Sequence, residues 1–298
     1  MQFSHCHVPW IHVIGVGQRQ HISTSVIADR GYGTGRTGYG SVVRVWVAAL
    51  FVALVSAAAA PAADVQLKII FHEGQTARQM SDQVSAVRLI AIHKRHVTPV
   101  LTGARYAAAS ATTPRPAGFP RGRSIEGFLF PAGYIFGPST TANGLIELQL
   151  AQFAKDWATI DLGARKPYAV LIVASMVERE TAAPEERKLV SAVIWNRLAK
   201  GMPLAIDATL RYGLGIPGNR PITAAEQKNQ TPYNTGIRPG LPPTPIGNPG
   251  LPSMQAAAHP AAVDYLYYVR KPHDIHHFFT ASEAEFCAKA KEYGYRGC

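Results

Sequence analysis

Two glutamates stand at the end of an apolar segment, where an ionised side chain is costly to bury. The run AVLIVASMV leads directly into Glu178, Arg179 and Glu180. Removal from water disfavours the charged form of a carboxyl group and raises its pKa. Such a group can serve as a general acid near neutral pH. Taken alone, the pattern is also typical of two solvated glutamates in the last turn of a helix.

Helix geometry allows only one of the two carboxyl groups to face a given cleft. Each residue of an α-helix turns the chain by about 100°, so Glu178 and Glu180 point about 200° apart. The other glutamate is then expected to lie at the surface or to pair with a basic neighbour. The basic residues near it in the sequence are Arg179, Arg187 and Lys188.

The elements that must position these glutamates follow from the pattern of the second half of the chain. Helical patterns cover residues 144–160 and 167–200. Long helices are not expected between Pro217 and Pro260, where Pro and Gly are dense. The segment DYLYYVR (264–270) predicts a strand, and ASEAEFCAKAKEYG (281–294) predicts a last helix with Ser282 as its cap.

The first half of the chain predicts a membrane-type segment and a small α/β unit. Residues 45–60 are apolar except for Ser56, and Arg36 and Arg44 precede them. This pattern favours a signal-anchor helix or a cleavable signal, with residues 64–298 outside the cytoplasm; a buried core helix is the remaining alternative. VQLKIIF (65–71) then predicts a strand, and Thr76 is placed to cap a helix through Val84.

Composition limits the partners. Thirty Lys and Arg against 19 Asp and Glu give a net charge of +11, which favours an anionic partner. The chain has no Lys/Arg run typical of a nucleic-acid-binding arm, so we expect no nucleic acid as a partner.

His276 and His277 are adjacent and would face opposite sides of a strand, which argues against a metal site. In an exported domain, Cys287 and Cys298 are positioned to form a short-loop disulfide.

Several short segments, taken in order, resemble one family. The resemblance is to the membrane-anchored endolytic murein transglycosylases of the MltG or YceG-like family, and it covers about residues 64–298. The segments that carry it are EGFLFPAGYIF (126–136), ASMVERET (174–181), NRLAKGMPLAIDATLRYGLG (196–215), TPYNTG (231–236), GLPPTPIGNPG (240–250), AAAHP (256–260), DYLYYV (264–269) and HHFF (276–279).

The resemblance implies an α+β fold with four segments. These are a poorly structured N-terminal extension (1–40), a transmembrane or signal-anchor segment (41–63), a LysM-like subdomain (64–125) and a YceG-like catalytic domain (126–298). It implies a single-pass protein of the cell inner membrane whose catalytic part faces the periplasm. The expected partners are peptidoglycan glycan strands, the membrane and peptidoglycan synthases, with no cofactor.

The same resemblance implies a lytic transglycosylase that cleaves the β-1,4 bond between N-acetylmuramic acid and N-acetylglucosamine and leaves 1,6-anhydro ends. One carboxyl group suffices for that reaction, because the substrate's own groups supply the nucleophiles. Glu180 is the expected acid, since Thr181 follows it as a small hydroxyl residue does in related enzymes, and Glu178 is the second choice. The expected substrate-binding residues are Tyr233, Asn234, Asp207, Thr209, Asn248 and His277, and Asn196 is a weaker choice.

The chain departs from the family pattern at several positions, including Ala132 and Gly133 after FP, Ala208 and Gly236. These departures affect the expected substrate contacts and leave the proposed acid in place. Two alternatives stay open at this point: a peptidoglycan-binding envelope protein without activity, and a true hydrolase.

Overall fold

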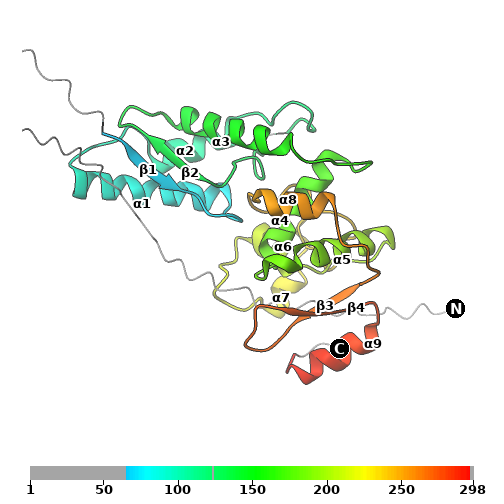
Figure 1. The fold of residues 1–298 in the computed structure, drawn as a ribbon. Coiled ribbons are helices and arrows are strands. Elements are labelled where there is room, and N and C mark those ends of the chain that lie inside the picture. Colours follow the sequence, from blue (N-terminus) through cyan, green and yellow to red (C-terminus); the bar gives the residue numbers. More distant parts are fainter. Residues whose placement is uncertain (1–64, 123, 296–298) are drawn as a thin grey trace, which may run out of the picture.

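The computed structural model describes residues 65–122 and 124–295, and Figure 1 shows them as two lobes. In the upper lobe, strands β1 (Leu67–Ile70) and β2 (Gly133–Phe136) pair antiparallel, with Leu67 opposite Phe136. Helices α1 (Ala77–Arg95), α2 (Gly103–Thr112) and α3 (Ala142–Trp157) complete this lobe.

Helix α1 begins where the sequence predicts. The Thr76 hydroxyl accepts a hydrogen bond from the Gln79 N–H, and the Gln79 side chain accepts one from the Thr76 N–H, which forms a capping box. The predicted strand at 65–71 and the helix start at Thr76 are therefore confirmed. The helix runs beyond the expected end at Val84 to Arg95, and His96 ends it in the left-handed conformation (φ 55°).

The lower lobe is mainly helical and contains the end of the apolar run. Thr181 is extended, and Pro184 follows shortly after, so the predicted 167–200 helix is broken into separate pieces. The elements of this lobe are α4 (Pro167–Glu180), η1 (Pro184–Glu186), α5 (Arg187–Ala199), α6 (Asp207–Leu214), α7 (Ala224–Gln227), α8 (Leu251–Ala258), β3 (Tyr267–Arg270), β4 (His277–Thr280) and α9 (Glu283–Glu292).

Helix α4 lies at the centre of the lower lobe. Nine of its residues are buried, from Val170 through Val177 and then Glu180, and it packs against α8, α5 and α6. An amphipathic surface helix buries only one face, so burial of almost every position identifies α4 as a core helix. Its last turn therefore carries polar side chains into the interior of the protein.

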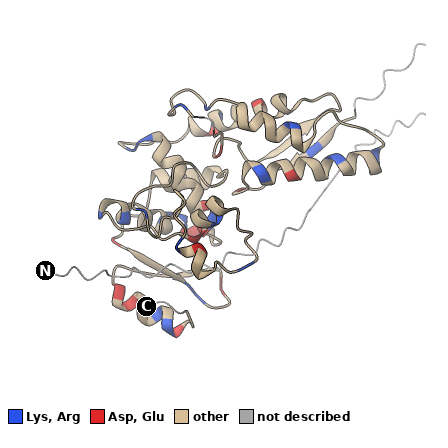
Figure 2. Cartoon of the chain, turned by 180° about the vertical axis from the view of Figure 1, so that it is seen from behind, with Lys and Arg blue, Asp and Glu red and all other residues tan. Residues whose placement is uncertain are grey.

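Successive side chains of strand β3 belong to two different hydrophobic clusters. Tyr268 belongs to the main hydrophobic core, whereas Tyr267 and Val269 pack with Phe286 and Ala290 of α9. Side chains of successive strand residues point to opposite faces, so Tyr268 alone of these three points toward α4. The predicted strand at 264–270 and the Ser282 cap of α9 are both confirmed. Figure 2 shows acidic residues at the start of α9 and basic residues later, which suits the helix dipole.

The fold is α+β, as expected from the sequence. The predicted boundary after residue 125 lies between β1 and β2 in the sequence. These two strands hydrogen-bond to each other, and one hydrophobic core includes residues of both lobes.

The predicted membrane segment lies outside the described residues. Within residues 65–122 and 124–295, no helix is long and apolar enough to span a bilayer. Cys287 is disulfide-bonded, and the predicted partner Cys298 lies outside the described residues.

Candidate functional site

The last turn of α4 sends three polar side chains into three different environments. The Glu178 carboxylate accepts a hydrogen bond from the Gly250 N–H (3.0 Å) and lies 3.7 Å from the Arg187 guanidinium. Arg179 turns toward the upper lobe and donates to the Gly74 carbonyl (3.3 Å). The two glutamates thus face apart, as helix geometry predicts, and Glu178 is occupied by contacts within the protein.

Glu180 is the buried carboxyl group of this turn. Only 3% of its surface is exposed, and the Tyr268 hydroxyl donates to its Oε2 at 3.0 Å. Burial, followed by the nearby charge of Asp207, raises the pKa of Glu180 to about 7 against the opposing effects of Tyr268 and Arg179. A carboxyl group with this pKa is half protonated near neutral pH, which suits a group that gives and then takes a proton.

Asp207 is the second acidic group of this region. It is the first residue of α6, and its N-cap is Ile206, so the alternative that Asp207 itself caps the helix is wrong. Burial raises the pKa of Asp207 to about 7, partly offset by Arg211. A second carboxylate close to Glu180 disfavours ionisation of the Glu180 carboxyl group, so the charge of Asp207 acts in the same direction as burial.

The His277 side chain contacts the ring of Tyr268, whose hydroxyl group bonds to Glu180. Its Nδ1 is 2.6 Å from Glu186 Oε2, and its backbone N–H donates to Glu186 Oε1 at 2.9 Å. Burial lowers the pKa of His277, which favours the neutral imidazole. The imidazole meets the Tyr268 ring edge to face, with centroids 5.3 Å apart. Glu186 and His277 together thereby support the phenol that binds Glu180.

Several buried polar atoms around Glu180 have no hydrogen-bond partner among the described residues. They include Thr181 Oγ1, Asp207 Oδ1 and His277 Nε2. Unsatisfied buried polar atoms are uncommon in folded proteins, and they concentrate where a ligand or water completes the bonding. These three belong to the residue after Glu180, to its acidic neighbour and to the residue that supports Tyr268.

Asn248 was expected to donate to sugar, and its side chain is fully occupied within the protein. Its Oδ1 accepts from the Gly127 and Leu129 N–H groups, both at 2.9 Å. Its Nδ2 donates to the Gln75 carbonyl (2.9 Å) and to Glu126 Oε1 (2.8 Å). No amide hydrogen is left for a ligand, so the geometry favours a structural role for Asn248 in joining the two lobes.

The Asn234 side chain likewise fixes its own loop. It is completely buried, it donates to the carbonyl oxygens of Gln227 and Asn229, and its Oδ1 accepts from the Gly236 N–H. This bonding uses both amide hydrogens of Asn234, which again favours a structural role over a contact with an acetamido group.

Thr209 is also completely buried. Its hydroxyl donates to the Ile206 carbonyl (2.7 Å) and lies 2.9 Å from the Thr235 hydroxyl. These bonds tie the start of α6 to the loop that contains Asn234. Thr209 therefore fixes the first turn of α6, which carries Asp207, and its assignment as a substrate-binding residue stays a prediction.

Tyr233 does not make the contact expected of it. Its hydroxyl lies 2.8 Å from Thr244 Oγ1, and its ring meets Tyr212 edge to face. The hydroxyl that orients Glu180 comes from Tyr268, so the prediction that Tyr233 orients the carboxyl is wrong. Its assignment as a substrate-binding residue stays a prediction.

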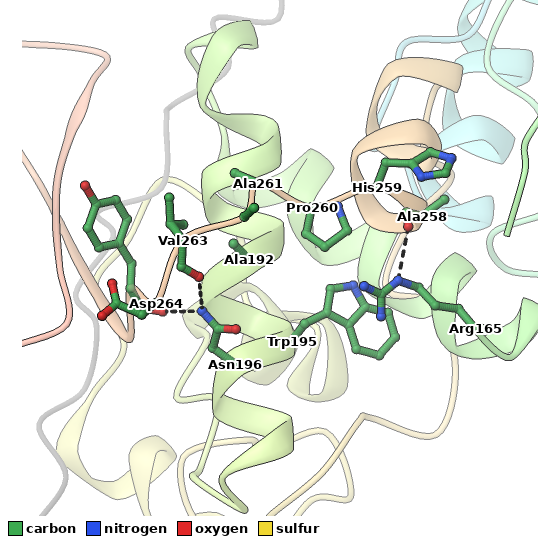
Figure 3. Close-up of a pocket in the computed structure, with 12 residues that line it drawn as sticks. Arg165, Ala192, Trp195, Asn196, Ala258, His259, Pro260, Ala261, Val263 and Asp264 are labelled. Carbon is green, nitrogen blue, oxygen red and sulfur yellow. Dashed lines mark hydrogen bonds between the residues drawn. The ribbon is translucent and has the colours of Figure 1, made fainter. Parts of the chain in front are cut away.

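Asn196 lines an open pocket of ≈ 930 Å³ that does not include Glu180. Its Nδ2 donates to the carbonyl oxygens of Val263 (2.9 Å) and Tyr265 (3.0 Å), as Figure 3 shows. Asn196 thus fixes the segment between α8 and β3, and that segment forms one wall of the pocket.

Two residues of the buried network had no role in the sequence interpretation. Glu126 accepts hydrogen bonds from the Ala77 N–H (3.0 Å) and the Tyr212 hydroxyl (3.1 Å), and burial raises its pKa to about 7. The sequence places Tyr268 in a predicted strand and in the segment DYLYYV, but predicts no contact for its side chain. The alternation of DYLYYVR was the available signal, since it sets Tyr268 apart from its neighbours, but it does not identify Glu180 as the partner.

Comparisons of the sequence with a family model and with named proteins indicate the same family. A model of the YceG-like family matches residues 46–292. A Bacillus subtilis protein named endolytic murein transglycosylase is 36% identical over 152 residues, which are 49% of this chain and 42% of that protein. A Streptococcus pneumoniae protein of the same name is 35% identical over 154 residues, 49% of this chain and 28% of that protein. The chain therefore aligns with less than half of each relative.

A solved structure supports the fold as well. The crystal structure of a yceG-like protein from Listeria monocytogenes superposes with a TM-score of 0.58 and 27% sequence identity, over 75% of each chain.

Proposed function

Since the chain belongs to the YceG-like family, we propose that it is an endolytic peptidoglycan lytic transglycosylase. It cleaves the β-1,4 bond between N-acetylmuramic acid and N-acetylglucosamine inside glycan strands and leaves 1,6-anhydro ends, which terminates strand elongation. The names of the Bacillus subtilis and Streptococcus pneumoniae relatives support this proposal.

The single observation that carries the proposal is the state of Glu180. Its carboxyl group is 3% exposed, has a pKa near 7 and is oriented by Tyr268, and unsatisfied polar atoms surround it. Glu178, in the same helical turn, differs from Glu180 because the Arg187 guanidinium lies 3.7 Å from its carboxylate and compensates its charge.

In the proposed reaction, Glu180 first acts as an acid. Its carboxyl proton passes to the glycosidic oxygen as the bond from that oxygen to C1 of the muramic acid breaks. The Glu180 carboxylate then takes the proton of the C6 hydroxyl while O6 forms a bond to C1 and closes the anhydro ring. The proton that Glu180 lost is thereby restored, and no water is consumed.

Tyr268 and Asp207 set the conditions for this cycle. The phenol of Tyr268 stabilises the carboxylate that exists between the two steps. Burial raises the pKa of the resting carboxyl group, and the charge of Asp207 adds to this effect. The free Nε2 of His277 and Oδ1 of Asp207 are the atoms we assign to substrate hydroxyl or amide groups. Tyr233 is proposed as a further substrate-binding residue.

We also propose the location expected from the sequence. The segment 41–63 anchors the protein in the cell inner membrane, and residues 64–125 and 126–298 act outside the cytoplasm as a LysM-like glycan-binding part and a catalytic part. The anionic polymer and the positive charge of the chain are complementary. Peptidoglycan synthases are the expected protein partners, because they make the strands that the enzyme cuts.

The test is to incubate the purified protein with peptidoglycan and to analyse the products by mass spectrometry. We expect 1,6-anhydro ends from the wild type, none from Glu180→Gln, and substantial activity from the matched Glu178→Gln variant. New reducing ends instead of anhydro ends would identify a hydrolase. Binding to peptidoglycan with no new ends would favour the non-catalytic envelope protein.

A further inference from the structure

The pocket beside α5 contains an arginine whose hydrogen-bonding groups are held in place but only partly used. Arg165 donates through Nε to the Ala258 carbonyl (3.1 Å), and its guanidinium lies over the Trp195 ring, 4.6 Å from the centroid. Figure 3 shows the side chain fixed between these two groups at the rim of the pocket. Among the described residues, neither of its terminal amino groups has a hydrogen bond or an ion pair.

A guanidinium fixed in this way is prepared to bind a carboxylate. Two parallel N–H groups match the two oxygens of a carboxylate, and stacking on Trp195 removes most of the entropy cost of ordering the side chain. Burial on the indole face also reduces competition from water. In the absence of a ligand, the contacts to Ala258 and Trp195 use the Nε and one face of the guanidinium and leave the outward pair of amino groups free.

The surroundings of Arg165 add to the preference for an anion. Lys166 and the exposed His259 line the neighbouring hollow, which shares Arg165 and Trp195 with the first pocket. The wall at the other end of the first pocket carries Asp264, which is exposed and has no ion pair among the described residues. The pocket therefore offers a site for a carboxylate at one end and a site for an amino group at the other.

We propose that this pocket binds the peptide stems that peptidoglycan carries on its muramic acid residues. Such stems are short peptides with free carboxylates, and a diamino residue in them supplies an amino group. Arg165 binds a stem carboxylate, the Trp195 edge packs against the peptide, and Asp264 faces the amine. This inference rests on the proposed function, because it takes peptidoglycan as the substrate, and it adds a second contact outside the Glu180 site.

The pocket is connected to the Glu180 region through aromatic contacts. Tyr265, at the end of the pocket, stacks on Phe279 with centroids 6.0 Å apart, and Phe279 lies 5.8 Å from Tyr268. In the proposed binding mode, a glycan strand held at Glu180 carries a neighbouring stem into this pocket. Recognition of the stem favours strands that still carry their peptides.

The test compares two glycan preparations of the same length, one with peptide stems and one stripped of them by an amidase. Binding to the full chain is measured by calorimetry in the Glu180→Gln background, so that no cleavage occurs. We expect the preparation with stems to bind about tenfold more tightly, since one charge-assisted pair is at stake. We expect Arg165→Ala to remove this advantage and Arg165→Lys, which keeps the charge but not the fork, to reduce it.

Arg88→Ala is the matched control. Arg88 is also half-buried and donates through Nε to a backbone carbonyl, that of Pro99 at 3.2 Å, but it lies on α1 in the upper lobe. This variant is expected to keep the full advantage of the stems. Melting curves check the fold, and if Arg165→Ala is unstable, the Arg165→Lys comparison decides.

The proposal is overturned if the protein with Arg165 intact binds both glycan preparations with the same affinity. It is also overturned if Arg165→Ala and Arg165→Lys still bind the preparation with stems more tightly to the full extent. Failure of the proposed function is a separate result. It would appear as an absence of 1,6-anhydro ends from both glycan preparations with Glu180 intact.

Discussion

Replacement of Glu180 by glutamine is predicted to make the protein more stable at pH 8 and no more stable at pH 4. In the wild type the pKa of Glu180 is raised from 4.5 to about 7 on folding. Between these two values the unfolded chain releases a proton that the folded protein keeps, so the free energy of unfolding falls as the pH rises, and the loss is complete above about pH 7. Glutamine resembles the protonated carboxyl group and has no such loss.

The size of the effect follows from the pKa difference. Each pKa unit is worth about 1.4 kcal/mol, so the variant gains about 3 kcal/mol over the wild type between pH 4 and pH 8. For a chain of 298 residues that gain raises the melting temperature by about 5 °C at pH 8. The gain is an upper value, because glutamine cannot accept both the Tyr268 hydrogen bond and the contact with the Ala208 N–H in the same way.

The assay is thermal or urea unfolding of the wild type and Glu180→Gln at several pH values, with Glu178→Gln as a control. Glu178 lies in the same helical turn, but it accepts from the Gly250 N–H and faces Arg187. Its replacement is expected to lower the stability at pH 8 by about 1 kcal/mol, the opposite sign. If the wild-type and Glu180→Gln curves run parallel from pH 4 to pH 8, burial does not hold Glu180 protonated and the assignment of the acid loses its basis.

Three further variants test the groups around Glu180. Tyr268→Phe removes a hydrogen bond that lowers the pKa of Glu180, so the alkaline limb of the pH–rate profile is expected to move up by about one pH unit; an unshifted limb would exclude this role. Asp207→Asn removes the charge that raises the same pKa, so the limb should move down and the rate at pH 8 should fall, as anhydro-end release would measure. Asn248→Ala cuts four hydrogen bonds between distant segments and is expected to cost about 3 kcal/mol in urea unfolding, with activity in the surviving folded fraction little changed.

Local features of the fold were predictable because they depend on nearby residues. The Thr76 and Ser282 caps and the β1 segment each involve residues a few positions apart. A run of apolar residues also indicated the buried helix that ends at Glu180. The pairing of β1 with β2 was not predictable in the same way, since about 60 residues separate the strands and no local pattern fixes the partner.

The candidate site shows the same division. The position of Glu180 at a buried helix end was evident from AVLIVASMVERE, because burial and a carboxyl group occur in one segment. Tyr268 is 88 residues away, and a tyrosine in a strand has many possible partners. The resemblance to a family indicated Asn234, Asn248 and Thr209, but it could not distinguish a residue that binds substrate from one that holds a loop.

That distinction comes from counting hydrogen bonds. The amide hydrogens of Asn234 and Asn248 all have partners within the protein, whereas Asp207 Oδ1 and His277 Nε2 have none among the described residues. Residues of the first kind build the support, and loss of one lowers the stability of the whole protein. Residues of the second kind already carry the cost of unmet hydrogen bonds in the free protein, so a ligand that satisfies them recovers that free energy on binding. Among the substrate-binding residues that the resemblance indicates, Asp207 and His277 are therefore the ones that we expect to contact a ligand beside Glu180, because only they have buried atoms left unsatisfied by the described residues.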